Sequence, residues 1–157
     1  MRWHRAFSKV TGTTIDGQAI DLDSLKGKWV VVNFFASWCV PCQLEHPELK
    51  QFVEEHAAAG DAAVVSIAFG DQPAAVKAYF ERNGGSWPAI VKDDGHAAID
   101  FGLTGVPESF VVAPNQLVVA HFEGVTAAQL DDVIRTYGGG APGGSIAPTT
   151  TAPVGGP

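Results

Sequence analysis

The sequence predicts an α/β fold in which a central mixed sheet carries helices on both faces. Two almost continuously apolar segments, 28–37 (KWVVVNFFAS) and 62–70 (AAVVSIAFG), are typical of strands buried on both faces. Each is followed by a helical segment, and this alternation indicates parallel strands joined by helices. Two further apolar segments, 108–113 and 117–122, are joined by a short Pro-Asn turn, which predicts an antiparallel edge.

A β-hairpin is expected ahead of the first buried strand. Residues 13–22 (TTIDGQAIDL) alternate around Asp16 and Gly17, a pair that suits a type I′ turn because both of its central residues need a positive φ. The segment therefore predicts two short edge strands.

A helix is predicted to begin at Val40 and to end at Gly60. Pro41 is tolerated in its first turn, whereas Pro47 removes a backbone donor and is expected to kink the helix. The residues expected on related faces of this helix are Leu44, Leu49, Phe52, Val53 and His56.

The remaining elements follow the same alternation. A second helix is predicted over 73–83, with Asp71 and Pro73 as its start signals. A strand over 87–91 and a short helical segment over 96–102 come next.

The last helix has both of its ends marked in the sequence. It is expected to begin at Thr126, whose capping box closes on Gln129, and to stop at Gly138.

One domain is predicted, over residues 12–137, because 157 residues with 46% hydrophobic content suffice for one core. Residues 1–11 are expected to be a lead, the remnant of a missing signal or anchor. The Gly-, Pro- and Thr-rich residues 138–157 predict a flexible tail.

A net charge of -7 argues against a nucleic-acid partner, and no segment reaches the roughly 18 apolar residues of a membrane span. We expect a soluble chain, and we expect it to be a monomer.

The only two cysteines, Cys39 and Cys42, are separated by two residues where the first buried strand gives way to the helix. A thiolate at a helix N-terminus is stabilised by unpaired amide donors and the helix dipole, so Cys39 is expected to be a nucleophile. Cys42, one turn further on, could resolve a mixed disulfide. A structural zinc site needs about four ligands, and the cysteine pair would supply only two of them. A purely structural disulfide that closes so short a loop would stabilise the fold little.

The motifs FFASWCVPC and GVPESF resemble the thioredoxin-fold family, in particular its extracytoplasmic TlpA-, ResA- and CcmG (DsbE)-like thiol-disulfide oxidoreductases. The resemblance covers about residues 12–137. It implies a thioredoxin-like fold with two additions, the N-terminal β-hairpin and an insertion through DDGHAAIDFGLTGVPES.

The resemblance also implies roles for single residues. Cys39 matches the attacking cysteine, Cys42 the resolving one, and Pro107 the family's cis-proline. A cis bond there would bring the Val106 backbone beside Cys39, where it could pair with an extended substrate and keep metals off the thiols. Pro47 matches the family's kinking proline.

Three more positions are left with two interpretations each. The resemblance implies that Glu45 raises a thiol pKa or accepts a proton, since Asn33 replaces the buried acid of plain thioredoxin; alternatively Glu45 is a solvated first-turn acid. Glu108 would line the active-site mouth or be a surface charge. Trp38 would shield the thiols and contact a partner, or be a half-buried aromatic at a strand end.

The function implied is that of a thiol-disulfide oxidoreductase that reduces disulfides of extracytoplasmic proteins such as apocytochrome c. A membrane donor would supply its electrons, and no cofactor or metal is expected beyond the Cys39–Cys42 pair. The expected location is the periplasm or cell envelope, whether the full-length form is anchored or secreted. Two alternatives stay open: a disulfide donor to secreted proteins, and a copper carrier on the same fold.

Overall fold

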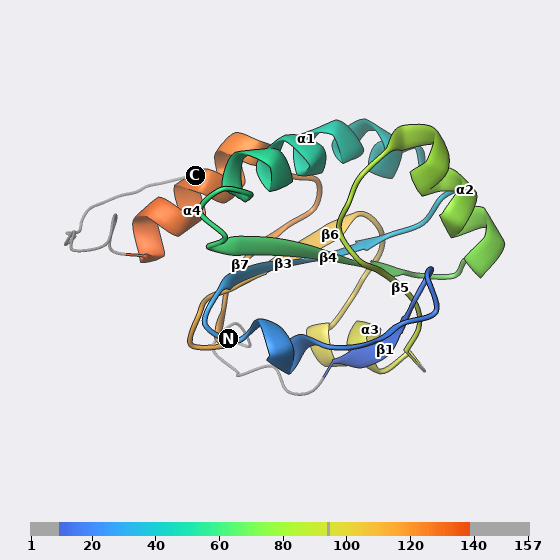
Figure 1. Cartoon of the computed structure of the whole chain (residues 1–157), viewed down its shortest axis with the longest axis horizontal. Helices are drawn as coiled ribbons and strands as arrows, with labels where there is room; N and C mark the ends of the chain where they lie inside the picture. The colour runs from blue at the N-terminus through green and yellow to red at the C-terminus, as the bar shows by residue number, and fades with distance from the viewer. Residues whose placement is uncertain (1–9, 94, 139–157) are drawn as a thin grey trace.

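The computed structural model describes residues 10–93 and 95–138 (Figure 1). The predicted N-terminal lead up to residue 9 and the predicted tail from residue 139 lie outside the described residues. No described helix is long and apolar enough to cross a membrane.

A seven-stranded mixed sheet forms the centre of the molecule, with the strand order β2-β1-β5-β4-β3-β6-β7. β3, β4 and β5 are parallel, while the hairpin at one edge and the β6–β7 pair at the other are antiparallel. The predicted α/β fold with a mixed sheet is therefore confirmed. The strands are β1 (Thr11–Thr14), β2 (Ala19–Asp21), β3 (Trp29–Phe35), β4 (Ala62–Ala68), β5 (Ala89–Lys92), β6 (Glu108–Val112) and β7 (Val118–Phe122).

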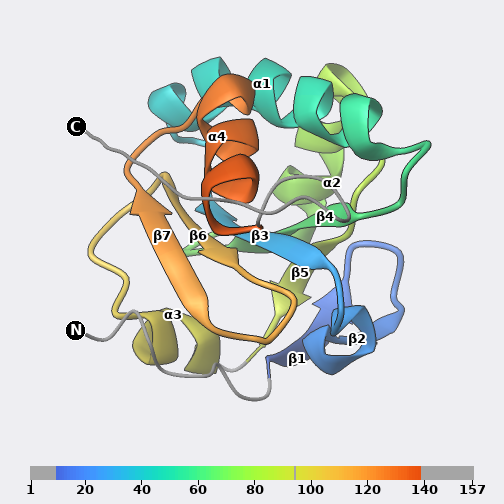
Figure 2. The ribbon, with the colours of Figure 1, turned by 90° about the vertical axis from the view of Figure 1, so that its left-hand side faces the viewer.

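Helices cover both faces of this sheet, as predicted. Figures 1 and 2 show α1, α2 and α4 on one face and α3 on the other. The helices are α1 (Val40–His56), α2 (Pro73–Asn83), α3 (His96–Phe101) and α4 (Ala127–Tyr137), with a 3-10 helix, η2 (Leu22–Leu25), after the hairpin. The predicted capping box of Thr126 and Gln129 begins α4.

β3 is buried along its whole length because successive side chains pack on opposite faces of the sheet. One set, Trp29, Val31 and Phe35, packs in the cluster beneath α1, α2 and α4. The other set, Val30, Val32 and Phe34, packs in the cluster on the α3 face. Both faces thus hold β3 in place, and its carboxyl end gives the cysteine pair a rigid base.

Two details differ from the sequence-based expectations. The hairpin turn is not type I′, which needs a positive φ at both Asp16 and Gly17. Gly17 has a φ of 80°, but Asp16 does not have a positive φ, since Gln116 is the only described non-glycine residue that does. Instead, the Thr14 carbonyl accepts a hydrogen bond from the Gly17 amide, and the Thr14 amide donates to the Gln18 carbonyl. This is the pattern of a three-residue hairpin loop in which the glycine forms a β-bulge.

The second difference concerns the face that α1 buries, along a helix that continues past Pro47 to His56. Leu44 does not share a face with Leu49 and Phe52, for its side chain is 74% exposed. The inner face follows the three- and four-residue spacing from Cys42 instead. Its buried members are Cys42, Glu45, His46, Leu49 and Phe52.

Candidate active site

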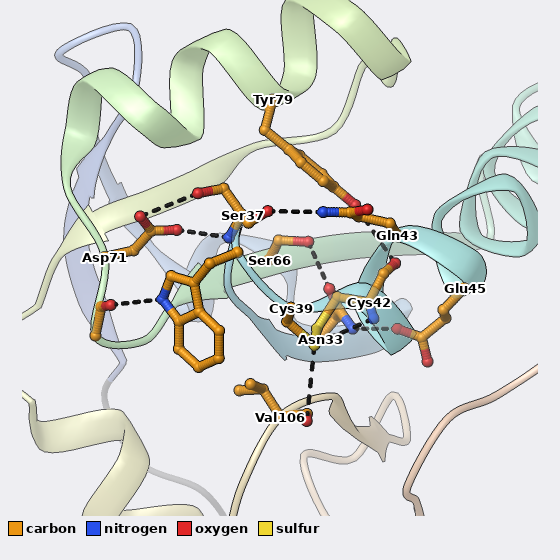
Figure 3. Close-up of a disulfide and its surroundings, with 12 residues drawn as sticks. Asn33, Ser37, Cys39, Cys42, Gln43, Glu45, Ser66, Asp71, Tyr79 and Val106 are labelled. Atoms are coloured by element: carbon orange, nitrogen blue, oxygen red, sulfur yellow. Dashed lines mark hydrogen bonds between the residues drawn. A yellow bond between two sulfur atoms is a disulfide. The ribbon is translucent and has the colours of Figure 1, made fainter.

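Cys39 and Cys42 form a disulfide at the N-terminus of α1, just beyond the carboxyl end of β3 (Figure 3). Cys39 is the N-cap residue, and its Sγ accepts a hydrogen bond of 3.1 Å from the Cys42 amide. Pro41 lies in the first turn, where the missing amide proton costs no hydrogen bond. Both cysteines are buried, with 4% and 2% exposure. The Cys42 amide therefore points at Cys39 Sγ at the N-terminus of α1, an arrangement that favours the Cys39 thiolate after reduction.

The loop before β6 lies beside the disulfide. The Val106–Pro107 peptide bond is cis, which confirms the prediction for Pro107. The Val106 carbonyl oxygen is 3.8 Å from Cys39 Sγ (Figure 3). The predicted approach of the Val106 backbone to Cys39 is therefore present.

The segment between β3 and α1 is tied to the loop after β4. The Asp71 carboxylate accepts a 2.6 Å bond from the Ser37 amide and a 3.1 Å bond from the Ser37 hydroxyl. The indole of Trp38 donates to the Gly70 carbonyl at 2.9 Å. Asp71 thus holds the cysteine segment rather than capping α2, whose N-cap is Gln72. With its side chain 61% exposed, Trp38 is not the half-buried aromatic of one interpretation.

Glu45 lies on the inner face of α1, one turn after Cys42, with 6% exposure. Its two carboxylate oxygens accept hydrogen bonds from the Asn33 side-chain amide at 3.1 Å and from the Val125 backbone amide at 2.9 Å. Burial raises the pKa of Glu45 to about 7, against the lowering effect of these two bonds. The interpretation of Glu45 as a solvated acid is therefore wrong.

Asn33 belongs to a set of buried polar residues that the sequence analysis did not identify. Ser66 donates to the Asn33 side-chain oxygen at 2.9 Å, and the Asn33 nitrogen also donates to Ser109 at 3.1 Å. Trp87 in turn donates to Ser66 at 2.8 Å. A polar residue within each of three largely apolar strands was the available signal, because buried polar groups need partners.

Tyr79 of α2 packs against the same turn of α1, and its hydroxyl donates to the Cys42 carbonyl at 3.4 Å. Burial raises the pKa of Tyr79 to about 12, and the nearby charge of Glu45 adds to the effect. Tyr79 therefore stays protonated at neutral pH.

Glu108 is buried at 3% exposure, so it is not a surface charge. Its register opposite Phe34 and its spacing from Phe110 place its side chain on the α3 face of the sheet, away from α1. There it accepts bonds from the Thr104 amide at 3.0 Å and the Thr104 hydroxyl at 2.6 Å, and lies 3.3 Å from His121. This position differs from the predicted one at the mouth of the active site.

The same region holds the described side chains whose donor atoms could meet around a cation. Ligand atoms of Glu108, His121 and Glu123 lie within 4.8 Å of one another. Two of these three groups already have partners within the protein, since Glu108 is bound by Thr104 and contacts His121.

Comparisons with known proteins agree with this geometry. The model of the AhpC/TSA family matches residues 4–121. The thiol:disulfide interchange protein DsbE of Allochromatium vinosum is 30% identical over 80% of this chain and 70% of its own length. CycY of Rhizobium leguminosarum, also named a thiol:disulfide interchange protein, is 37% identical over 61% of this chain. That match covers only 50% of CycY, so the chain spans about half the length of this relative.

Solved structures are similar as well. A thiol:disulfide interchange protein of the thioredoxin family from Chlorobium tepidum is 31% identical, with a TM-score of 0.76 over 84% of this chain and 94% of its own. The structure of DsbF from Mycobacterium tuberculosis is 26% identical, with a TM-score of 0.70 over 83% of this chain and 92% of its own. The chain therefore belongs to the AhpC/TSA family, among its thioredoxin-fold thiol-disulfide oxidoreductases.

Proposed function

We propose that this protein reduces disulfides of extracytoplasmic proteins, with Cys39 as the attacking thiolate and Cys42 as the resolving thiol. One observation carries the proposal: a cysteine at the N-cap of α1 lies beside the cis-proline loop, and a buried carboxyl lies one turn beyond its partner cysteine. This arrangement provides a stabilised nucleophile, a place for a substrate backbone and a proton acceptor.

The reaction starts from the dithiol form. The Cys39 thiolate attacks one sulfur of the substrate disulfide, and the other substrate sulfur leaves as a thiolate that takes up a proton. Cys42 then loses its proton and attacks Cys39 Sγ, which releases the second substrate thiolate. The substrate gains two electrons and two protons, and Cys39–Cys42 becomes the disulfide.

Glu45 is the group we assign to take the proton of Cys42. It lies one helical turn from Cys42, and its pKa of about 7 makes both of its protonation states accessible near neutral pH. Tyr79 cannot share this task, because its raised pKa of about 12 keeps its hydroxyl protonated. The side-chain amide of Asn33 does not titrate, so it cannot accept the proton either.

The substrate face is assigned to the rim of the disulfide. The exposed Trp38 and Val40, each 61% exposed, offer apolar contacts on one side of Cys39. On the other side, the backbone of Val106 beside Pro107 can pair with an extended chain. Such a rim suits an unfolded cysteine-containing segment, and we propose apocytochrome c as this substrate.

The cellular setting follows from the same proposal. Reduction in the periplasm or cell envelope runs against an oxidising environment, so a membrane donor must return electrons to Cys39–Cys42. We expect the chain to act as a monomer there.

A disulfide donor remains as the second candidate, and one contact favours it. The Cys42 amide donates to Cys39 Sγ in the disulfide, and the same donor would stabilise the Cys39 thiolate of the reduced form. Stabilising the reduced form makes a disulfide a stronger oxidant.

The reduction potential of the Cys39–Cys42 couple, measured against defined thiol buffers, separates the two directions. A value near about -270 mV would support the reductase. A value near about -120 mV would contradict it and identify a disulfide donor. A third result, tight one-to-one binding of Cu(I) that protects both thiols, would instead support a copper carrier.

The roles of the cysteines are tested by exchanging each for serine. Cys39→Ser should abolish reduction of a protein disulfide, whereas Cys42→Ser should accumulate mixed disulfides with the substrate. Full activity of the Cys39→Ser protein would refute its role as nucleophile.

A further inference from the structure

A row of three buried polar side chains crosses the centre of the sheet beneath α1. Asn33 of β3 is in register with Ser66 of β4 on one side and with Ser109 of β6 on the other. None of the three is more than 2% exposed. Trp87 adjoins the row at Ser66. Glu45 lies against Asn33 (Figure 3).

The hydrogen bonds of this row run in one direction, and the indole sets that direction. Trp87 Nε1 can only donate, and it donates to Ser66 Oγ. The single proton of the Ser66 hydroxyl then goes to Asn33 Oδ1. Because the amide oxygen of Asn33 is engaged there, its nitrogen faces the opposite way.

The other end of the row is the carboxylate of Glu45. Asn33 Nδ2 donates one proton to Glu45 Oε1 and the other to Ser109 Oγ, both at 3.1 Å. An Asn33 amide turned by 180° would instead present its oxygen to Glu45, which would favour the protonated carboxyl. The orientation of this amide therefore affects the ionisation of Glu45.

We propose that Trp87 and Ser66 are positioning residues for Glu45, because they hold the Asn33 amide in the orientation that donates to the carboxylate. They thereby set the pH at which Glu45 exchanges its proton. The importance of this setting for the reaction rests on the proposed function, but the positioning is a property of the folded protein in its disulfide form.

Titratable groups of α1 and α2 lie around Glu45. Tyr79 of α2 stays protonated, and burial lowers the pKa of His46, which packs on Trp87. Cys42 does not titrate while it is in the disulfide.

The carboxylate of Glu48 on α1 is bound to the Ala127 amide, and the segment before α4 contributes the Val125 amide to Glu45. β3, β4 and β6 contribute the neutral row itself.

The test is the titration of the Glu45 carboxyl carbon by NMR in the oxidised protein, compared between Ser66→Ala and Ser109→Ala. Ser66→Ala frees the Asn33 amide to turn, so the pKa of Glu45 should rise by about one unit, roughly the effect of one hydrogen bond to a carboxylate. Ser109→Ala removes the same hydroxyl from the same row. Since Ser109 accepts from Asn33, the donor chain stays intact and the pKa of Glu45 should stay where it is.

Equal shifts in the two variants, or no shift in Ser66→Ala, would overturn the proposal. If Ser66→Ala does not fold, Trp87→Phe replaces it: without the indole proton the Ser66 hydroxyl can turn, and a smaller rise of the same sign is expected. No rise in Trp87→Phe would then overturn the proposal. A reduction potential that refutes the reductase would leave this titration unaffected, so the two proposals fail separately.

Discussion

Glu45 and Glu108 are both almost completely buried, at 6% and 3% exposure, but the sheet separates them. Glu45 lies beneath α1, on the face that carries the disulfide, and burial raises its pKa to about 7. Glu108 lies on the α3 face. Burial would raise its pKa too, yet the bonds from Thr104 and the contact with His121 outweigh that effect and lower it.

The difference lies in the donors that each carboxylate meets. Glu45 accepts from two neutral amides, those of Asn33 and Val125. Glu108 accepts from an amide and a hydroxyl of Thr104 and has His121 at 3.3 Å, a partner that can carry positive charge. Burial acts to raise the pKa of both acids, and their hydrogen-bonding partners decide whether that pKa ends above or below its ordinary value.

The largest expected effect comes from exchanging each acid for its amide and measuring the rate of protein-disulfide reduction between pH 5 and 9. Glu45→Gln should slow resolution by Cys42 by about 100-fold, the lower range for a general base. The parent rate should rise as pH passes about 7 because Glu45 ionises there, and the variant should lack this rise. Glu108→Gln should keep both the rate and the rise.

Glu48→Gln is the matched control for that experiment. Glu48 lies one turn beyond Glu45 on α1 and accepts from the Ala127 amide at 2.8 Å, much as Glu45 accepts from Val125. An equal loss of rate in Glu48→Gln would show that the helix contact to α4, rather than proton transfer by Glu45, limits the reaction.

A smaller effect is expected on stability, with opposite pH dependence for the two acids. The raised pKa of Glu45 means that the folded state holds a proton that the unfolded state releases between pH 4.5 and about 7. The free energy of unfolding should therefore fall by about 3 kcal/mol as pH rises through this window. Urea unfolding of the oxidised protein at several pH values measures this slope, and Glu45→Gln should remove it.

Glu108 should behave in the opposite way. Its lowered pKa adds stability that is fully present above the ordinary carboxyl value of 4.5 and is lost as pH falls through the folded pKa. Glu108→Gln should cost about 1 to 3 kcal/mol at pH 7, because Thr104 loses a charged acceptor. A Glu108→Gln protein as stable as the parent at pH 7, or a Glu45→Gln protein with the parent slope, would end the contrast.

Sequence patterns located the elements well because burial of strands and helices follows simple periods. β3, β4 and the N-terminus of α1 lie where apolar runs and cap signals predict them, and the cysteine pair follows from that placement. Leu44 shows the limit, because an apolar side chain was assigned to the inner face although its spacing from Cys42 places it outside.

The two acids show what the sequence could not give. Glu45 follows Cys42 by three residues and Glu108 directly follows Pro107, and the resemblance to the family predicted both acids at the active site. Which sheet face Glu108 occupies depends on the register between β6 and β3, and the pKa of Glu45 depends on Asn33 and Val125, which lie far from it in sequence. Such long-range pairings are set by tertiary packing rather than by local pattern.

The smallest expected effect is at the far end of α1, where the same rule acts on a histidine. His56 lies between Asp61 and Asp131, with 2.8 Å from a ring nitrogen to each carboxylate. Burial would lower the pKa of His56, but the bonds to Asp131 and Asp61 outweigh it and raise the pKa. Here too the partners, rather than burial, decide the sign.

The raised pKa means that these contacts add stability that is fully present below pH 6.5, the ordinary histidine value, and is lost as pH rises through the folded pKa. His56→Gln should therefore cost more at pH 5.5 than at pH 8.5, by about 1 kcal/mol or less, because Asp61 and Asp131 are partly exposed and solvent screens them. Urea unfolding at the two pH values measures the difference, with Asp132→Asn, which breaks the exposed Arg135 pair, as the control. An equal cost at both pH values would mean that His56 acts by packing against Phe52 and that its two carboxylates are not stabilising partners.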